Sequence, residues 1–200
     1  FRIDFDSGAI TASNAAGASS KCRQIAAGGV YTGVGDAWEQ VHDAKAEAVA
    51  DLVEEMSGQP VLVAYEFKHD LERLRRVLGK DTPHIGGGVT TAQAKRIETE
   101  WNAGRIPVLL GQPQSMAHGL NLQESGNALI WHTPTWNYED YDQFIRRVWR
   151  QGQKNKRVVV HRVLARATLD EAVVAALAAK AKGQGALFTA IKDYWKGKKK

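Results

Sequence analysis

The sequence predicts an open α/β domain with a mainly parallel sheet and helices on both faces. Short strand-like segments such as 61–65, which is continuously apolar, and 128–132 alternate with longer segments whose apolar residues recur at helical spacing. Continuous apolar strands are typical of parallel sheets, because both faces of such sheets are buried. Regular alternation of strand and helix also favours right-handed crossovers, with ligand sites at the carboxyl ends of the strands.

Length and composition are consistent with one globular domain. The 200 residues are 44% hydrophobic and 24% charged, which suffices for a substantial core. The apolar stretches are shorter than the roughly 18 residues of a membrane span, and the first residues do not resemble a signal peptide. We therefore expect a soluble, unsecreted protein. Because the sequence opens at Phe1, we also expect it to be part of a longer chain.

Charge and cysteine content limit the kinds of site. A net charge of +5 permits attraction to phosphate, although four lysines lie in the tail 196–200. Cys22 is the single cysteine, which excludes an internal disulfide, and no zinc-ligand spacing surrounds it. We expect Cys22 to be a buried, unreactive thiol.

The first part of the chain is predicted to lead into the domain. Residues 1–35 are expected to form an irregular entry segment with one short helix near 21–27. A longer helix is predicted to open with Asp36 as N-cap and to end at Gly58. Its apolar residues share one face: Trp38, Val41, Ala48, Val49, Leu52, Val53 and Met56.

Strands and helices then alternate. Strands are predicted at 61–65, 84–85, 107–110, 128–132 and 158–164. Helices are predicted at 91–103, 138–150 and 169–182, and after the first strand, where Leu71, Leu74, Val77 and Leu78 point inward. The domain is thus expected to span 36–182. Residues 183–200 are expected to form a separate docking helix and a basic tail, with an apolar side of Leu187, Phe188, Ile191, Tyr194 and Trp195.

The helix at 138–150 carries the strongest chemical signal. At 100° per residue, Gln143, Arg147 and Arg150 project within about 60° of one another, and the apolar residues take the opposite side. Guanidinium groups suit phosphate oxygens and the charge that develops in phosphoryl transfer. Because this helix follows a buried strand, we expect the arginines at the carboxyl edge of the sheet. A solvated basic face is the alternative.

The surrounding residues resemble a known motif. Trp136 and Asn137, followed by Gln143, Arg147, Arg150 and the ending Arg-x-Gly-Gln, resemble motif six of the Swi/Snf branch of superfamily-two helicases. The resemblance implies a RecA-like lobe that lacks its own P-loop. It also implies that Arg150 is an arginine finger, that Arg147 assists it on the phosphates, and that Gln143 orders the pair.

The segment 112–123 resembles motif five of the same family. By that resemblance Gly119 and Asn121 face the nucleotide, while Gln114 and Ser115 contact the DNA backbone. The sequence departs from the family at 115–117, where Ala-Gly-Gly is common. An ordinary strand-to-helix turn is the alternative, and His118 is expected to be structural.

Looser matches occur elsewhere in the expected order. Segments 24–31 and 86–88, together with Lys45, Arg96 and Trp101, resemble the family pattern. Segment 61–67 resembles motif four, which implies DNA contacts by Lys68 and His69. Trp136 and Asn137 are expected beside the same DNA track, with a core position as the alternative for Trp136.

The family resemblance implies half of a motor. The sequence contains no P-loop motif and no acidic pair for magnesium, as expected when nucleotide binds between two lobes. It therefore implies ATP and Mg²⁺ held mainly by an N-terminal lobe of the same parent chain, and translocation along the double-stranded DNA backbone. We expect a monomer, inactive in isolation, in a bacterial or phage-infected cell, or in the nucleus of a eukaryote. A non-catalytic binding module and an RNA or strand-separating helicase remain alternatives.

Overall fold

A five-stranded parallel sheet forms the centre of the protein. The computed structural model describes residues 2–5, 8–11, 14–116 and 119–197. The strand order is β6-β7-β5-β8-β9, and each neighbouring pair is parallel. The strands are β5 (Val61–Ala64), β6 (His84–Ile85), β7 (Val108–Gly111), β8 (Ala128–Trp131) and β9 (Val159–Arg162). The predicted α/β class is confirmed.

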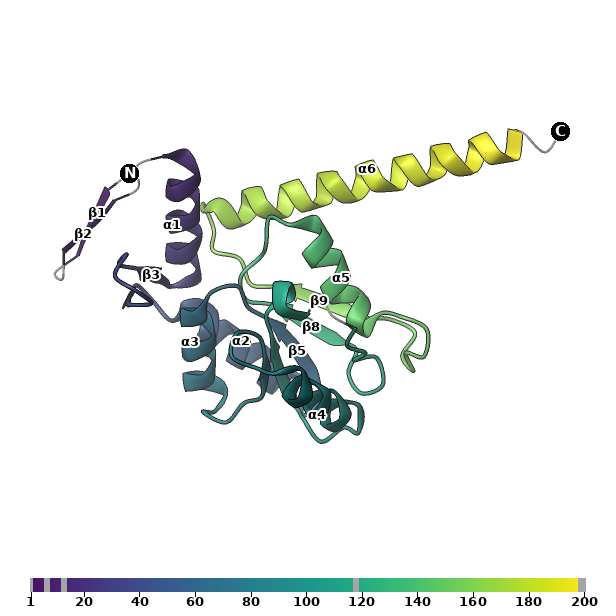
Figure 1. The fold of residues 1–200 in the computed structure, drawn as a ribbon, viewed down its shortest axis with the longest axis horizontal. Coiled ribbons are helices and arrows are strands. Elements are labelled where there is room, and N and C mark those ends of the chain that lie inside the picture. Colours follow the sequence, from purple (N-terminus) through teal and green to yellow (C-terminus); the bar gives the residue numbers. More distant parts are fainter. Residues whose placement is uncertain (1, 6–7, 12–13, 117–118, 198–200) are drawn as a thin grey trace.

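Helices cover both faces of the sheet (Figure 1). Strand side chains alternate between the two faces, so Val61 and Val63 pack in one core and Leu62 packs in the other. The first core lies beneath α2 (Ala44–Glu55) and α3 (Lys68–Leu78). The second lies beneath α4 (Thr91–Asn102), α5 (Tyr138–Val148) and the start of α6 (Leu169–Gly197).

The beginning of the chain is more regular than predicted. An antiparallel hairpin of β1 (Arg2–Phe5) and β2 (Gly8–Thr11) precedes α1 (Ala15–Ala27), the short helix that was expected. A second antiparallel pair follows, with β3 (Gly29–Tyr31) against β4 (Trp38–Gln40). In Figure 1 the first hairpin lies outside the central sheet, next to the start of α1.

The helix predicted to open at Asp36 is wrong in its first two turns. Residues 38–40 form β4, and α2 begins at Ala44. The Trp38 indole donates a hydrogen bond to Glu72, and Asp36 forms an ion pair with Lys68. Tertiary contacts with α3 and pairing with β3 therefore override the helical spacing of the local sequence.

The end of the chain also differs from the prediction. α6 is a single helix that continues through Gly183, so the break expected there is wrong. Figure 1 shows its C-terminal half extending away from the sheet. The apolar side chains predicted to dock from 187–195 lie outside the residues whose side chains are described. Of the described helices, none is both long enough and apolar enough to cross a membrane.

Two smaller predictions are corrected. Val77 on α3 is 38% exposed rather than inward, because it lies at the outer side of the helix while Leu74 is fully buried. Cys22 is a free thiol but is only partly buried, since α1 lies at the periphery. The boundaries of the entry segment and the domain stay predictions.

Candidate functional site

α5 is held to the sheet by one apolar face. Tyr141, Phe144 and Val148 are buried, and the ring centroids of Tyr141 and Phe144 lie 4.8 and 5.2 Å from that of Trp131 on β8. The opposite face borders an open surface hollow of about 490 Å³. Its lining includes the three residues predicted to act on phosphate, Gln143, Arg147 and Arg150, together with Arg146, Trp149 and Gln151.

The two arginines are tied to the segment that follows η1 (Pro113–Met116). Arg147 Nη1 donates to the Leu120 carbonyl at 3.2 Å, and the Arg147 carbonyl accepts from the Leu122 amide at 2.9 Å. An Arg150 guanidinium N–H donates to Asn121 Oδ1. The structure therefore brings the two predicted motifs together, with Gly119 close in sequence at a φ of +71°.

Charge is concentrated where these arginines meet. Partial burial, and secondarily the positive charge of Arg150, lowers the pKa of the Arg147 guanidinium. The backbone N–H of Asn121 in turn donates to Glu98 Oε1 at 2.8 Å. The site thus holds two neighbouring guanidinium groups on a braced loop, an arrangement suited to a multiply charged anion.

The predicted position of the arginines at the carboxyl edge is wrong. α5 begins after the carboxyl end of β8 and runs back along the sheet, and Gln153 beyond it donates to the Gly126 carbonyl, which precedes β8, at 3.0 Å. An 11-residue helix is about 16 Å long at 1.5 Å per residue, which exceeds the length of a four-residue strand. The arginines therefore lie at the amino-terminal edge.

Most of the predicted DNA contacts do lie at the carboxyl edge. Lys68, Gln114, Ser115 and Asn137 are exposed, and each follows the end of a central strand. Some are also engaged locally: Lys68 pairs with Asp36 at 2.6 Å, and Ser115 Oγ donates to Gln112 at 2.9 Å. Asn137 caps α5 by accepting from the Glu139 amide at 2.9 Å.

Two of the predicted DNA contacts pack against the protein instead, His69 completely and Trp136 in part. His69 is fully buried among Tyr31, Trp38 and Phe67, with ring centroids 5.1–5.5 Å away, so its predicted contact with DNA is wrong. The imidazole packs against these rings, and its Nδ1 lies 3.1 Å from Asp70 Oδ1. Trp136 is partly buried and packs against the second core, which favours the core position left open for it.

Residues 44–152 match the family model described as the helicase conserved C-terminal domain, and this match covers more than half of the chain. The chain belongs to this family. The predicted identity, a C-terminal superfamily-two lobe of the Swi/Snf type, is confirmed, and we refer to the chain below as the helicase lobe.

The helicase lobe has relatives in viruses and eukaryotes. It is 40% identical over 194 residues to the putative protein p41 of Acyrthosiphon pisum secondary endosymbiont phage 1, a match covering 95% of the lobe and 41% of that protein. It is 31% identical over 120 residues to the mouse DNA repair and recombination protein RAD54-like, covering 58% of the lobe and 16% of the relative. The lobe therefore spans less than half the length of these relatives.

A solved structure shares the fold of the helicase lobe. The C-terminal part of the Fun30 ATPase domain superimposes with a TM-score of 0.58 at 21% sequence identity, covering 66% of the lobe and 44% of that chain. At this identity the likeness shows the fold, which is the RecA-like arrangement that the sequence resemblance implied.

A buried polar network in the helicase lobe was not predicted. Asp70 Oδ2 accepts from the Thr133 hydroxyl at 3.0 Å and from the Phe67 amide at 3.0 Å, with His132 Nδ1 3.7 Å away. Burial acts to raise the pKa of Asp70, but His132 and His69 hold that pKa well below its usual value. The network joins the ends of β5 and β8. The sequence signal for this network was weak: Asp70 is a charged residue on the face of α3 that packs against the sheet.

Buried cations fix the entry segment to the helicase lobe. Arg73 donates to Asp43 at 2.9 Å and to the Ala27 and His42 carbonyls at 2.6 and 2.7 Å. Gly28 permits this packing, because its φ is +107° and an added Cβ would lie 2.2 Å from Arg73 Nη2. Lys45, which the resemblance had singled out, forms a buried ion pair with Asp170 at the start of α6.

Proposed function

We propose that the helicase lobe is the second motor lobe of an ATP-dependent translocase on double-stranded DNA. In this proposal Arg150 and Arg147 act on a nucleotide held by a preceding lobe, with Gln143 ordering the pair. Membership of the helicase C-terminal family supports an ATP hydrolase role within a larger protein. The observation that carries the finer assignment is the pair of guanidinium groups beside the open hollow.

The amino-edge position is compatible with this role. The carboxyl-edge rule applies to ligands bound by the sheet's own loops. A nucleotide cradled by another lobe need only meet an accessible surface, and Arg150 is exposed. Gly119 and Asn121 lie next to the arginines in this proposal, where Asn121 positions Arg150 through its side-chain hydrogen bond.

The residues present suit the phosphate end of a nucleotide but not its metal. Two guanidinium groups offer several N–H donors to phosphate oxygens. Across the described ranges, no group of three or more His, Cys, Asp or Glu side chains could hold a metal ion. We therefore assign ATP and Mg²⁺ mainly to the preceding lobe. ATP and Mg²⁺ bound there would supply the γ-phosphoryl group that is transferred to water.

The chain's own residues contribute electrostatics and position. Arg150 and Arg147 would stabilise the negative charge that develops on the transferred group, because fixed cations need little reorganisation. The carboxyl edge, with Lys68, Gln114, Ser115 and Asn137 exposed, would contact the DNA backbone without reading its sequence. When the cleft between the lobes closes and reopens, the arginine site and the carboxyl edge would then move as one unit.

DNA-stimulated ATPase activity of the full-length protein tests this proposal. We expect Arg150→Ala to lower the stimulated turnover number at least about 1,000-fold, in line with the effect of arginine fingers. Arg147→Ala should be comparably or somewhat less damaging. The matched control is Arg146→Ala, since Arg146 lies on the same helix but is paired with Asp142 at 2.5 Å.

The result can contradict the proposal directly. Normal turnover in a folded Arg150→Ala protein would show that this arginine does not act on the nucleotide. The isolated 200-residue chain is expected to hydrolyse no ATP, with or without duplex DNA. Activity in that chain would show that it holds a complete nucleotide site.

A further inference from the structure

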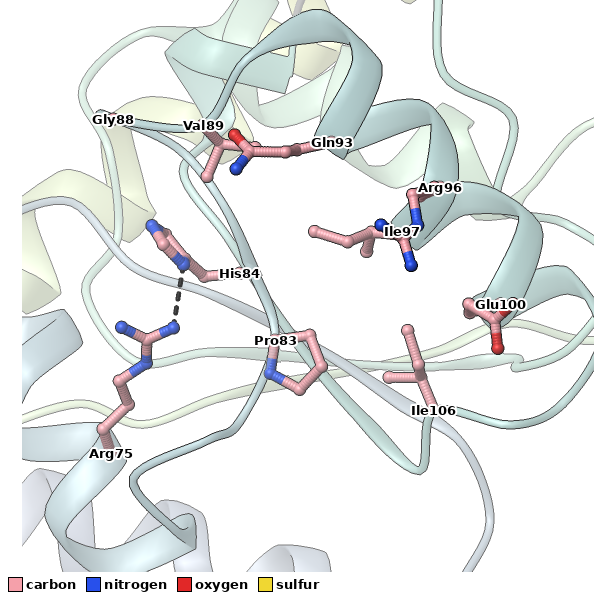
Figure 2. Close-up of a pocket in the computed structure, with 10 residues that line it drawn as sticks. All are labelled: Arg75, Pro83, His84, Gly88, Val89, Gln93, Arg96, Ile97, Glu100 and Ile106. Carbon is pink, nitrogen blue, oxygen red and sulfur yellow. Dashed lines mark hydrogen bonds between the residues drawn. The ribbon is translucent and has the colours of Figure 1, made fainter.

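A second hollow opens at the free edge of the central sheet. It has a volume of about 510 Å³ and lies between α3 and α4, beside β6, which is an edge strand of the five-stranded sheet (Figure 2). It shares no residue with the hollow around Arg147 and Arg150. Its apolar lining consists of Pro83, Val89, Ile97 and Ile106.

One side of this edge hollow carries a fixed guanidinium group. Arg75 projects from α3, and its Nε and Nη2 donate to the Thr82 carbonyl at 3.1 and 3.0 Å. Arg75 Nη2 also lies 2.9 Å from His84 Nδ1. Burial, assisted by the charge of Arg75, lowers the pKa of His84, so the ring stays neutral and can accept this hydrogen bond. Arg75 is therefore oriented before any ligand arrives.

A second cation faces the hollow from α4. Figure 2 shows Arg96 and Glu100 on the same helix as Ile97. Glu100 is engaged by Arg105 through two contacts of 2.5 and 2.7 Å. Arg96 is exposed, and its charge helps to lower the pKa of Glu100, although the larger cause is the hydrogen bond from Arg105. The edge hollow thus combines an apolar floor with two arginines and one glutamate, and the hydrogen bonds of that glutamate go to Arg105, outside the lining.

We propose that the edge hollow binds an acidic peptide segment of a partner protein. An apolar side chain of that segment would contact Ile97 and Ile106, and a neighbouring carboxylate would lie between Arg75 and Arg96. Charge complementarity selects an anionic ligand, and charge-assisted hydrogen bonds to arginine give it orientation. The apolar floor favours a peptide over nucleic acid, because the lining residues include no Phe, Tyr or Trp on which a base could stack.

Binding of labelled peptides to the full-length protein tests this inference. The probes are fluorescein-labelled heptapeptides in which a central leucine or phenylalanine is flanked on each side by three acidic residues. We expect saturable anisotropy changes, and NMR shifts at the methyl groups of Val89, Ile97 and Ile106. Peptides with lysine flanks or a central serine should bind at least about tenfold more weakly, since they lack one of the two matching features.

Matched variants separate this site from general charge attraction. Arg96→Glu should weaken binding of the acidic peptides about tenfold or more, whereas Arg166→Glu, the same change at an exposed residue outside the hollow, should not. Arg96→Gln provides a second variant if the first does not fold. ATPase activity should be unchanged in all three, so failure here is distinct from failure of the proposed motor function.

Three outcomes would overturn the inference. The first is the absence of saturable peptide binding at millimolar concentration, and the second is peptide binding of equal affinity in the wild type and the Arg96 variants. The third is a short DNA duplex that shifts the methyl signals of the same three residues and depends on Arg96, while the acidic peptides do not compete with it. This third outcome would assign the edge hollow to nucleic acid.

Discussion

Arg73 and Arg150 show how one side-chain type serves two purposes in the same lobe. Arg73 is fully buried, and its guanidinium is bonded to Asp43 and to two backbone carbonyls. Arg150 is exposed beside a hollow and bonds to a single amide oxygen of Asn121. A guanidinium with its donors already used can only hold the protein together. One with donors remaining at the surface can receive a ligand.

Removal of the buried arginine is expected to have the largest effect on stability. Arg73→Ala leaves Asp43 and two carbonyls without their donor, and we expect it to lower the free energy of unfolding by about 3–5 kcal/mol. Urea denaturation followed by circular dichroism measures the change. Arg76→Ala, on the exposed side of the same helix, should cost less than about 1 kcal/mol. Equal decreases in the free energy of unfolding for Arg73→Ala and Arg76→Ala would show that the burial of Arg73 does not add to stability.

The carboxylate beneath the carboxyl edge gives a smaller, pH-dependent effect. Asp70→Asn should lower the free energy of unfolding by about 1–3 kcal/mol at pH 7, because the Thr133 hydroxyl and the Phe67 amide then donate to a neutral acceptor instead of a charged one. The folded-state pKa of Asp70 lies below its unfolded value of about 4. The carboxylate therefore contributes fully above pH 4, and its contribution is lost as the pH falls below that value.

Urea titrations at pH 7, 5 and 3.5 measure this dependence. The difference between wild type and Asp70→Asn should be constant from pH 7 to 5 and narrower at pH 3.5. Glu100→Gln is the control, because Glu100 is paired with Arg105 near the surface and screened by solvent. If the difference in free energy of unfolding between wild type and Asp70→Asn increased as the pH fell, the negative charge assigned to Asp70 would be contradicted.

The smallest effect is expected at the surface proposed for DNA. Lys68→Ala in the full-length protein should weaken duplex binding a few-fold and reduce the slope of log affinity against log salt by about 1. Anisotropy titrations between 50 and 200 mM salt would measure both. Arg150→Ala should leave this slope unchanged, since it lies at the opposite edge of the sheet. If both variants reduced the slope of log affinity against log salt, the assignment of DNA and nucleotide to opposite edges of the sheet would be contradicted.

Regular segments were predictable because their patterns are local. The apolar strand at 61–64 and the helix at 91–102 follow directly from continuous and helical spacing. The prediction of a helix from Asp36 was wrong because local spacing contains no information on the pairing of strand 38–40 with strand 29–31. Strand pairing is a tertiary contact, and it overrides a local preference of this size.

The clustering of the candidate site residues was predictable from the sequence, but the edge of the sheet on which they lie was not. The amphipathic pattern of α5 identified Gln143, Arg147 and Arg150, and the structure gathers them around one hollow. Their edge was mistaken because only the start of a crossover helix lies at the carboxyl ends of the strands. His69 and Asp70 were hidden for another reason, since charged residues on a buried helix face are rare and sequence patterns assign them to the surface.

The length of α5 has a mechanical consequence. Asn137 caps its first turn beside one surface, and Arg147 lies in its last turn beside the other. Phe144, near the middle of α5, is buried in the core and fixes the helix to the sheet. We therefore expect a displacement of one end of α5 to change the position of the other end, because backbone hydrogen bonds join its successive turns.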